Sequence, residues 1–158
     1  MVFHTLDPGR ANDVVSQLHL DSPVCMISLL KFRHTADYSS HPISEVTEPI
    51  SGREAFSKHY RPNVQRVFAA VSERDKEFVR PELILSGDSA QVLMAGLGAR
   101  TDGLDENWDT FLITRYPSLE VALKLVASEE YEKWCLPHRL AALEDYRIVV
   151  GVEIGKEF

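Results

Sequence analysis

The sequence predicts an α+β domain whose core elements follow the order β-α-β-β-α-β. Two apolar segments rich in β-branched or aromatic residues, Val24–Phe32 and Trp108–Tyr116, are typical of central strands. Each is followed along the chain by an amphipathic segment with helical spacing, and Tyr146–Ile154 alternates as a closing strand. This order is the ferredoxin-like arrangement, in which two helices cover one face of a four-stranded antiparallel sheet.

The N-terminal segment, residues 1–22, is expected to be a helical extension of the core. Asp7 followed by Pro8 is typical of an N-cap with proline at the first helical position. After the first strand, His34–Ser51 is polar and contains two prolines. A loop of this length inside a compact domain is more often functional or disordered than neutral, so it is the candidate lid.

The segment Gly52–Val71 is expected to form the first core helix. Its apolar residues recur at helical spacing, which predicts a stripe that packs on the sheet. An interior proline removes a backbone hydrogen bond and costs roughly 3 kcal/mol in a regular helix. Pro62 therefore predicts a bend or a break between Tyr60 and Asn63.

A β-hairpin is expected next. Glu82–Ser86 and Ala90–Leu97 are short apolar runs on either side of Gly87-Asp88-Ser89, a combination typical of a tight turn between two strands.

Capping residues then divide the C-terminal part of the chain. Pro117 ends the strand before it, and Ser118 is placed to cap a helix that begins at Leu119. Ser128 and Pro137 are each expected to open a further helical turn.

Composition restricts the class of protein. A chain of 158 residues suits one domain, with residues 23–158 as the ferredoxin-like core. The net charge of -7, without a basic block, argues against nucleic acid or a membrane as a partner. Two cysteines indicate neither a disulfide framework nor a thiolate metal site, so we expect a cytoplasmic protein. No phosphate-binding glycine loop or GxSxG motif is present, and we expect no metal and no cofactor.

Strand alternation divides the two central strands into two sets of side chains. We assign the mixed set to the sheet face away from the helices, where a dimer or a pocket would cover it. On that assignment, Leu112→Glu is expected to abolish the dimer. The apolar set is Cys25, Ile27, Leu29, Phe111 and Ile113, and the mixed set is Met26, Ser28, Leu30, Phe32, Trp108, Thr110, Leu112, Thr114 and Tyr116.

Four segments resemble the family known as domain of unknown function 1330, a branch of the dimeric α+β barrel superfamily. They are PVCMISLLKF, SGREAFSKHY, WDTFLITRYPS and SEEYEKWCLPHRLAALEDYRIV, and the resemblance covers Pro23 to Val150. Its most specific part is Tyr131, Arg139 and the apolar stretch Leu140–Leu143. The resemblance implies a homodimer whose two sheets close into a barrel around a cavity. Relatives include cofactor-free monooxygenases, polyketide cyclases, isomerases, haem-handling enzymes and proteins without an established reaction.

Candidate catalytic residues come from two clusters. His138 could serve as an acid or base beside Arg139, which could bind a carboxylate; alternatively, Arg139 pairs with Asp109 or Glu130 and His138 lies at the surface. His59 and Tyr60, just before the proline, could point into a cavity or could belong to a solvated helix face.

Candidate binding residues come from the mixed set. Its hydroxyls could hydrogen-bond a ligand while its rings supply stacking surface; alternatively, the same residues form a plain dimer interface. These binding candidates are Ser28, Thr110, Thr114, Phe32, Trp108 and Tyr116, together with Arg139.

Two classes of function follow from these candidates. One is an enzyme that acts on a small apolar or aromatic molecule by proton transfer, cyclisation or cofactor-free oxidation, with His138, His59 or Tyr60 moving the proton. The other is a non-catalytic homodimer that binds a small ligand or serves as a scaffold. A histidine beside a tyrosine in the cavity would favour the enzyme, whereas hydroxyls alone would favour binding.

Overall fold

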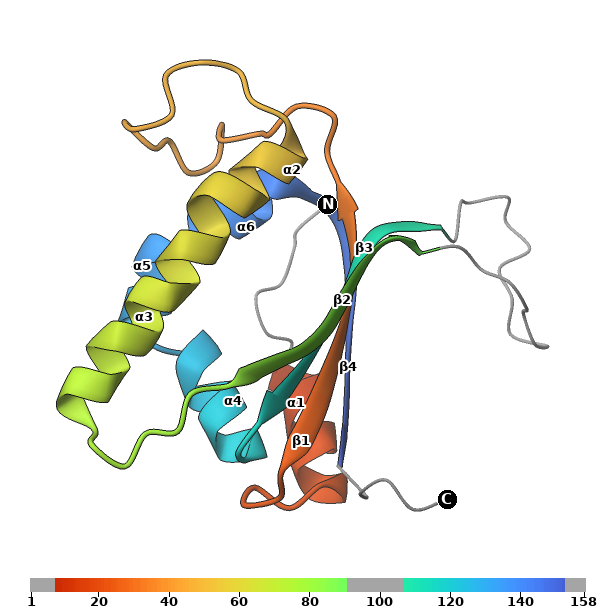
Figure 1. Cartoon of the computed structure of the whole chain (residues 1–158), viewed down its shortest axis with the longest axis vertical. Helices are drawn as coiled ribbons and strands as arrows, with labels where there is room; N and C mark the ends of the chain where they lie inside the picture. The colour runs from red at the N-terminus through yellow and green to blue at the C-terminus, as the bar shows by residue number, and fades with distance from the viewer. Residues whose placement is uncertain (1–7, 91–106, 153–158) are drawn as a thin grey trace.

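The computed structural model describes residues 8–90 and 107–152. The elements follow the predicted order of strands and helices (Figure 1). Asp7, the predicted N-cap, lies outside the described residues. The elements are α1 (Pro8–Gln17), β1 (Val24–Phe32), α2 (Gly52–Glu54), the π-helix η1 (Ala55–Tyr60), α3 (Arg61–Arg74), β2 (Glu82–Ala90), β3 (Trp108–Tyr116), α4 (Leu119–Val126), α5 (Glu129–Trp134), α6 (Leu136–Ala142) and β4 (Leu143–Val152).

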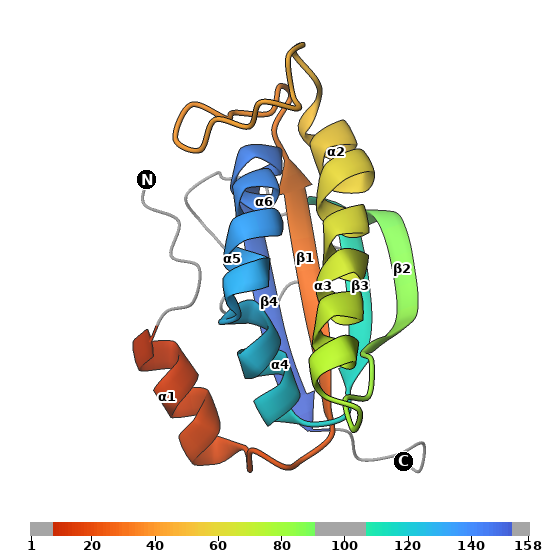
Figure 2. The same ribbon diagram turned by 90° about the vertical axis from the view of Figure 1, so that its left-hand side faces the viewer.

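The four strands form one antiparallel sheet in the order β2-β3-β1-β4. The long helix α2-η1-α3 and the helices α4, α5 and α6 lie side by side over one face of it, whereas α1 stands apart (Figure 2). In the register, Ser28 of β1 lies opposite Leu112 of β3 and Ile148 of β4. The predicted α+β fold with helices on one face of the sheet is confirmed.

The helix that carries Pro62 continues through the segment where a bend or a break was predicted (Figure 1). It begins at a capping box, in which the Ser51 side chain accepts a hydrogen bond from the Glu54 amide. Ahead of the proline the helix widens into the π-helix, and the Arg61 amide bonds to the Phe56 carbonyl, five residues back. The irregularity lies just before the predicted segment between Tyr60 and Asn63, and the chain accommodates the proline with a wider turn instead of breaking.

The predicted tight turn at Gly87-Asp88-Ser89 is wrong. These residues belong to the single strand β2, where Gly87 lies opposite Phe111 and Asp88 lies opposite Thr110 of β3. A Cβ atom at Gly87 would lie 2.3 Å from the Phe111 ring, so glycine serves close packing here. Residues 91–97 of the predicted second hairpin strand lie outside the described residues.

The capping residues of the C-terminal part are confirmed. The side chains of Ser118 and Ser128 accept hydrogen bonds from the amides of Val121 and Tyr131, at the starts of α4 and α5. Pro137 lies in the first turn of α6. The closing strand begins at Leu143, earlier than the alternation predicts.

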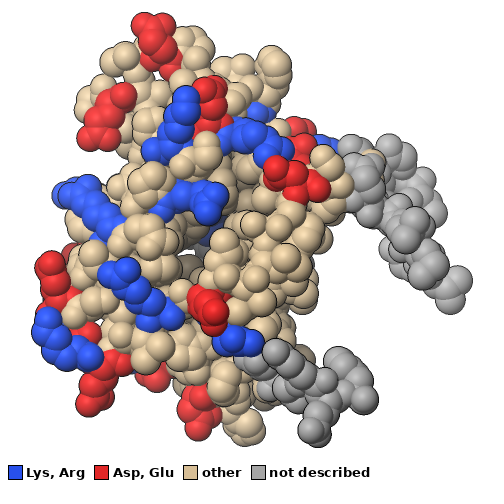
Figure 3. Space-filling model, in the orientation of Figure 1, with Lys and Arg blue, Asp and Glu red and all other residues tan. Residues whose placement is uncertain are grey.

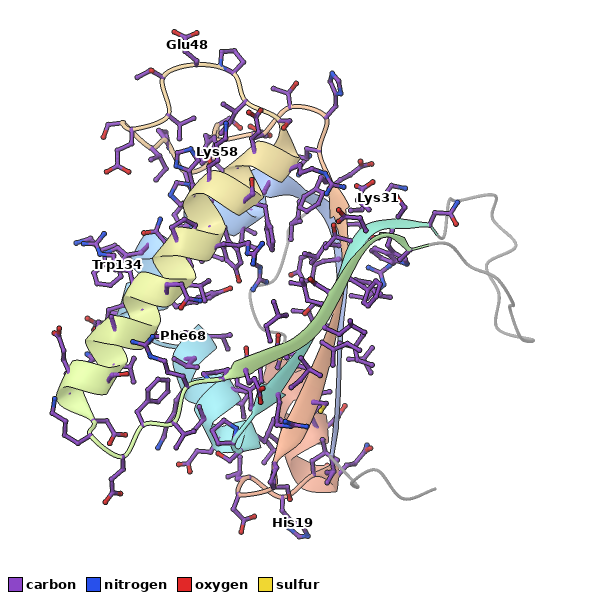
Figure 4. All side chains as sticks on the ribbon, in the orientation of Figure 1. His19, Lys31, Glu48, Lys58, Phe68 and Trp134 are labelled. Atoms are coloured by element: carbon purple, nitrogen blue, oxygen red, sulfur yellow. The ribbon has the colours of Figure 1, made fainter. Side chains whose placement is uncertain are left out.

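The assignment of the two strand faces is reversed. Most of the mixed set faces the helices: Leu30 is 4% exposed and packs in one cluster with Phe56 and Leu143. Leu112 also lies inside the fold, where it lines two cavities, so Leu112→Glu is no test of a dimer. The apolar set lies on the outer face with Ile27, which is 39% exposed, and with Lys31, which is labelled in Figure 4. Strand periodicity shows which residues share a face but not which face meets the helices.

The loop of residues 33–51 packs against the end of the helical layer. The amide of Ala36 bonds to the Ile50 carbonyl, and the amide of Asp37 bonds to the Ala141 carbonyl of α6. Tyr38 packs against the same buried cluster as Phe56. The loop therefore contacts α6 through a backbone hydrogen bond and η1 through apolar packing.

Candidate functional site

A cavity of about 100 Å³ lies between the sheet and the helical layer. Its walls come from the inner faces of β1, β3 and β4, from the long helix, and from α4, α5 and α6. Most of the lining is apolar, including Phe56, Val67, Leu125 and Leu143, and it includes hydroxyl groups and one guanidinium group. These polar lining residues are Ser28, Tyr60, Tyr116, Tyr131, Arg139 and Tyr146.

Arg139 is the centre of the polar part of this cavity. Its side chain is buried, with 6% of the residue exposed, and its Nη1 donates to the Tyr131 hydroxyl at 2.9 Å. The Tyr131 hydroxyl lies 3.0 Å from the Tyr60 hydroxyl. The Arg139 Cζ atom lies 4.8 Å from the centre of the Tyr146 ring, a cation–π contact. Three tyrosines from three different elements therefore surround one buried cation.

The protonation states follow from burial. Burial raises the pKa of Tyr60 well above its ordinary value, and the neighbouring Tyr131 raises it further. Burial likewise raises the pKa of Tyr116 to about 12. Burial alone would lower the pKa of Arg139, but Tyr131 and Tyr60 raise it above its ordinary value. At neutral pH the cavity thus presents the neutral hydroxyls of Tyr60 and Tyr116 and a positive guanidinium group.

Local structure places each of these groups. The Ser128 cap starts α5, so Tyr131 occupies the first turn of that helix and points into the layer between helices and sheet. The π-helix ends at Tyr60, whose ring stacks on Phe56 with centroids 4.8 Å apart. π-helical segments inserted in α-helices occur frequently at functional sites, because they redirect side chains.

A second cavity, of about 420 Å³, opens next to the first, between the long helix and strands β2 and β3. The two cavities share Phe56 and Leu112 as lining residues. The space-filling view shows a hollow between the helix and the sheet, with basic side chains along its border (Figure 3). We call the first cavity the inner chamber and the second the outer chamber. The outer chamber is also lined by Phe32, Arg53, Ser57, Arg61, Ser86, Gly87, Asp88 and Thr110.

An ion pair lies in the outer chamber. The Asp88 Oδ1 atom accepts hydrogen bonds from the Thr110 hydroxyl at 2.6 Å and from the Arg53 Nη1 at 3.1 Å. These two donors, Thr110 first, hold the pKa of Asp88 below its ordinary value. Asp88 is therefore an ionised carboxylate with two fixed donors.

The two candidate histidines lie together, but outside both cavities. Their rings stack with centroids 5.2 Å apart and an interplanar angle of 15°. His138 is 3% exposed, and its Nδ1 atom lies 2.9 Å from the Tyr38 hydroxyl of the loop. Burial, followed by the charge of His59, lowers the pKa of His138. His138 is thus a buried neutral imidazole that contacts the loop, and the alternative that it lies at the surface is wrong.

The acidic residues considered as partners of Arg139 make other contacts. Glu130 pairs with Arg74 at 2.6 Å. Asp109 accepts a hydrogen bond from the Phe32 amide at 2.7 Å. Within the described ranges, no three His, Cys, Asp or Glu side chains gather closely enough to hold a metal ion.

The predicted site residues fall into separate groups. Tyr60, Ser28, Tyr116 and Arg139 line the inner chamber, whereas Phe32 and Thr110 line the outer one. Neither Thr114 nor Trp108 is among the lining residues, and the Trp108 ring lies 5.6 Å from the Arg147 guanidinium.

Two tyrosines of the inner chamber, Tyr131 and Tyr146, were not among the predicted site residues. The family resemblance names Tyr131 together with Arg139, but the two lie on separate helices that meet at Cys135, so helical periodicity alone does not bring them together. Tyr146 falls where helix α6 has already given way to strand β4, so no single periodicity reaches it.

Comparisons with solved structures show the fold. The RPA0582 protein from Rhodopseudomonas palustris, a structural genomics target of unknown function, matches with a TM-score of 0.67 and 19% identity, over 98% of this chain and 100% of that chain. Methylated RPA0582 protein matches with a TM-score of 0.64 and 21% identity, over 98% of both chains. No family model and no curated protein matches this chain. The resemblance to domain of unknown function 1330 thus stays a prediction from sequence motifs.

Membrane spans were sought among the described helices, and none of these helices has both the length and the apolar character needed to cross a bilayer.

Proposed function

We propose that this protein binds a small carboxylate with an apolar or aromatic body in the inner chamber. The observation that carries the proposal is the chemistry of the lining: among its described residues, Arg139 is the sole charged side chain, set among aliphatic and aromatic groups. A buried guanidinium group recognises a carboxylate through paired hydrogen bonds, and apolar walls accept a ring or a short chain.

The tyrosines support an anion as the ligand. The pKa values of Tyr60 and Tyr116 are raised, so these two hydroxyls stay protonated and can donate hydrogen bonds. The Tyr131 hydroxyl accepts a hydrogen bond from Arg139 and so holds the guanidinium group in place. A ligand oxygen would thus meet an oriented cation and neutral donors.

The size of the inner chamber restricts the ligand to a small molecule. Its volume is about 100 Å³, and apolar cavities on the order of 150 Å³ hold a single benzene ring. Short-chain carboxylates are therefore suitable probes, and benzoate, which is larger than benzene, tests the upper limit of this volume.

Binding without catalysis is better supported than the enzyme hypothesis. Proton transfer or cyclisation needs a base in reach of the substrate, with a pKa near the working pH. The described lining of the inner chamber includes no histidine, aspartate, glutamate or lysine. His59 and His138 contact each other and, through His138, the loop residue Tyr38.

Calorimetric titration with benzoate and with benzamide, a neutral molecule of the same shape, tests this proposal. We expect benzoate to bind at least tenfold more tightly, since only the anion pairs with the guanidinium group. Tyr131→Phe should weaken benzoate binding about three- to tenfold, because Arg139 loses the hydroxyl that orients it. Tyr38→Phe is the matched control, since Tyr38 bonds His138 outside the chamber. Equal affinities for the two ligands, or no binding of benzoate, would contradict the proposal.

We also propose that the chain forms a homodimer through the outer face of the sheet. This face exposes Ile27, Leu85 and Val149, with exposed fractions of 39%, 53% and 56%. These three residues lie on adjacent strands in register with Ile113, so they form one continuous apolar surface. A second copy supplies a self-complementary apolar surface around a two-fold axis. We further propose a cytoplasmic location, in keeping with a chain that has two cysteines.

A further inference from the structure

The outer chamber is lined by charged residues that take no part in the proposed inner site. It adjoins the inner chamber, with which it shares Phe56 and Leu112 as lining residues, and it holds two arginines, Arg53 and Arg61, against one carboxylate, Asp88. Its described lining therefore has a net positive charge at the place where a ligand would extend from the inner chamber.

The two arginines differ in their contacts. Arg53 is engaged: it pairs with Asp88 at 3.1 Å, and its Cζ atom lies 5.0 Å from the centre of the Phe32 ring. Asp88 in turn is held by the Thr110 hydroxyl. Arg61, by contrast, forms no ion pair and no side-chain hydrogen bond with any residue in the described ranges, so its guanidinium group is available to a ligand.

Arg61 is also adjacent in sequence to Tyr60, a residue of the inner chamber. It follows Tyr60, whose hydroxyl contacts Tyr131, and it begins α3 where the π-helix ends. Neighbouring residues of a helix point in different directions, about 100° apart in an α-helix. Tyr60 accordingly lines the inner chamber and Arg61 the outer one. One turn of the helix thus presents a hydroxyl to one chamber and a cation to the other.

We propose that the two chambers bind one ligand, a small apolar molecule with an anionic group at each end. Arg139 holds one carboxylate inside, the apolar body lies between Phe56 and Leu112, and Arg61 pairs with the second anionic group in the outer chamber. This inference rests on the proposed function and names its preferred ligand class, the aromatic or short aliphatic dicarboxylates.

Calorimetric titration of the full chain with benzoate, terephthalate and 4-carbamoylbenzoate tests this inference. The last molecule keeps the shape of terephthalate but replaces one carboxylate by a neutral amide. We expect terephthalate to bind about three- to tenfold more tightly than 4-carbamoylbenzoate, because the second charge meets a partly solvated arginine. The preference should decrease as salt is added.

Arg61→Gln should abolish this preference and leave benzoate affinity unchanged. Arg66→Gln is the matched control on the same helix, since the Arg66 Cζ atom lies 3.9 Å from the centre of the Trp134 ring and Arg66 lines neither chamber. If benzoate binds but the dicarboxylate preference is absent, or survives in Arg61→Gln, the inference is wrong while the proposed function stands. If benzoate itself fails to bind, the proposed function fails and the inference fails with it.

Discussion

Replacing Leu30 by alanine tests which face of the sheet meets the helices. Leu30 is 4% exposed and packs with Phe56 and Leu143. The substitution removes three carbon atoms, which amounts to about 2.4 kcal/mol of lost burial at about 0.8 kcal/mol for each. The space left behind adds about 1–2 kcal/mol, because neighbours on a helix and on two strands relax only in part. We therefore expect a loss of about 3.5–4.5 kcal/mol in the free energy of unfolding.

Urea unfolding followed by circular dichroism measures this loss, and Ile27→Ala is the matched comparison. Ile27 lies on the same strand, is 39% exposed, and loses the same number of carbon atoms. In dilute protein we expect a loss of roughly 1.5 kcal/mol, since water fills the space left on an open face. Equal losses, or a larger loss for Ile27→Ala, would refute the assignment of Leu30 to the helical face.

Three further predictions follow from the same structure. Val149→Glu should convert the proposed homodimer to a monomer in analytical ultracentrifugation, because it places an unpaired charge in the interface, whereas Val79→Glu on an exposed loop should not. Gly87→Ala should lower the free energy of unfolding by about 1–3 kcal/mol, and Gly151→Ala, with open space around its Cβ position, should change it by less than about 0.5 kcal/mol in the same urea titration. Burial lowers the pKa of His138 in the folded protein, so the unfolded chain binds more protons below about pH 6.5. The free energy of unfolding should therefore fall as the pH decreases from about 6.5 until the pH reaches the folded pKa of His138. His138→Phe should flatten this dependence in thermal unfolding scans between pH 7 and 5.

Much of the local structure was predictable because its causes are local. Ser118 and Ser128 cap helices through their own side chains, and the predicted bounds of β1 and β3 agree with the structure. Pro62 marked an irregular helix, although proline chemistry alone could not decide between a break and a π-helix. Gly87 was misread as a turn because the residue that requires a glycine there, Phe111, lies on another strand.

The candidate site was predictable only in part. Tyr60, Ser28, Tyr116 and Arg139 were expected to reach a cavity, but the cavity that they line is on the helical face of the sheet, opposite to the face predicted for Ser28 and Tyr116. The predicted use of His138 in that cavity depended on its place next to Arg139 in sequence. Adjacent residues of a helix point in different directions, so Arg139 reaches the inner chamber while His138 contacts His59.

The sequence by itself determined the order of the elements, the ends of several helices, and which strand residues share a face. These follow from hydrogen bonds and side-chain periodicity within a few residues. Only the tertiary structure decided which face is buried, and it brought Tyr60, Tyr131 and Arg139 together from three helical segments. Burial of a face depends on what packs against it, and contacts between distant segments are set by strand register and helix packing, which no local pattern encodes.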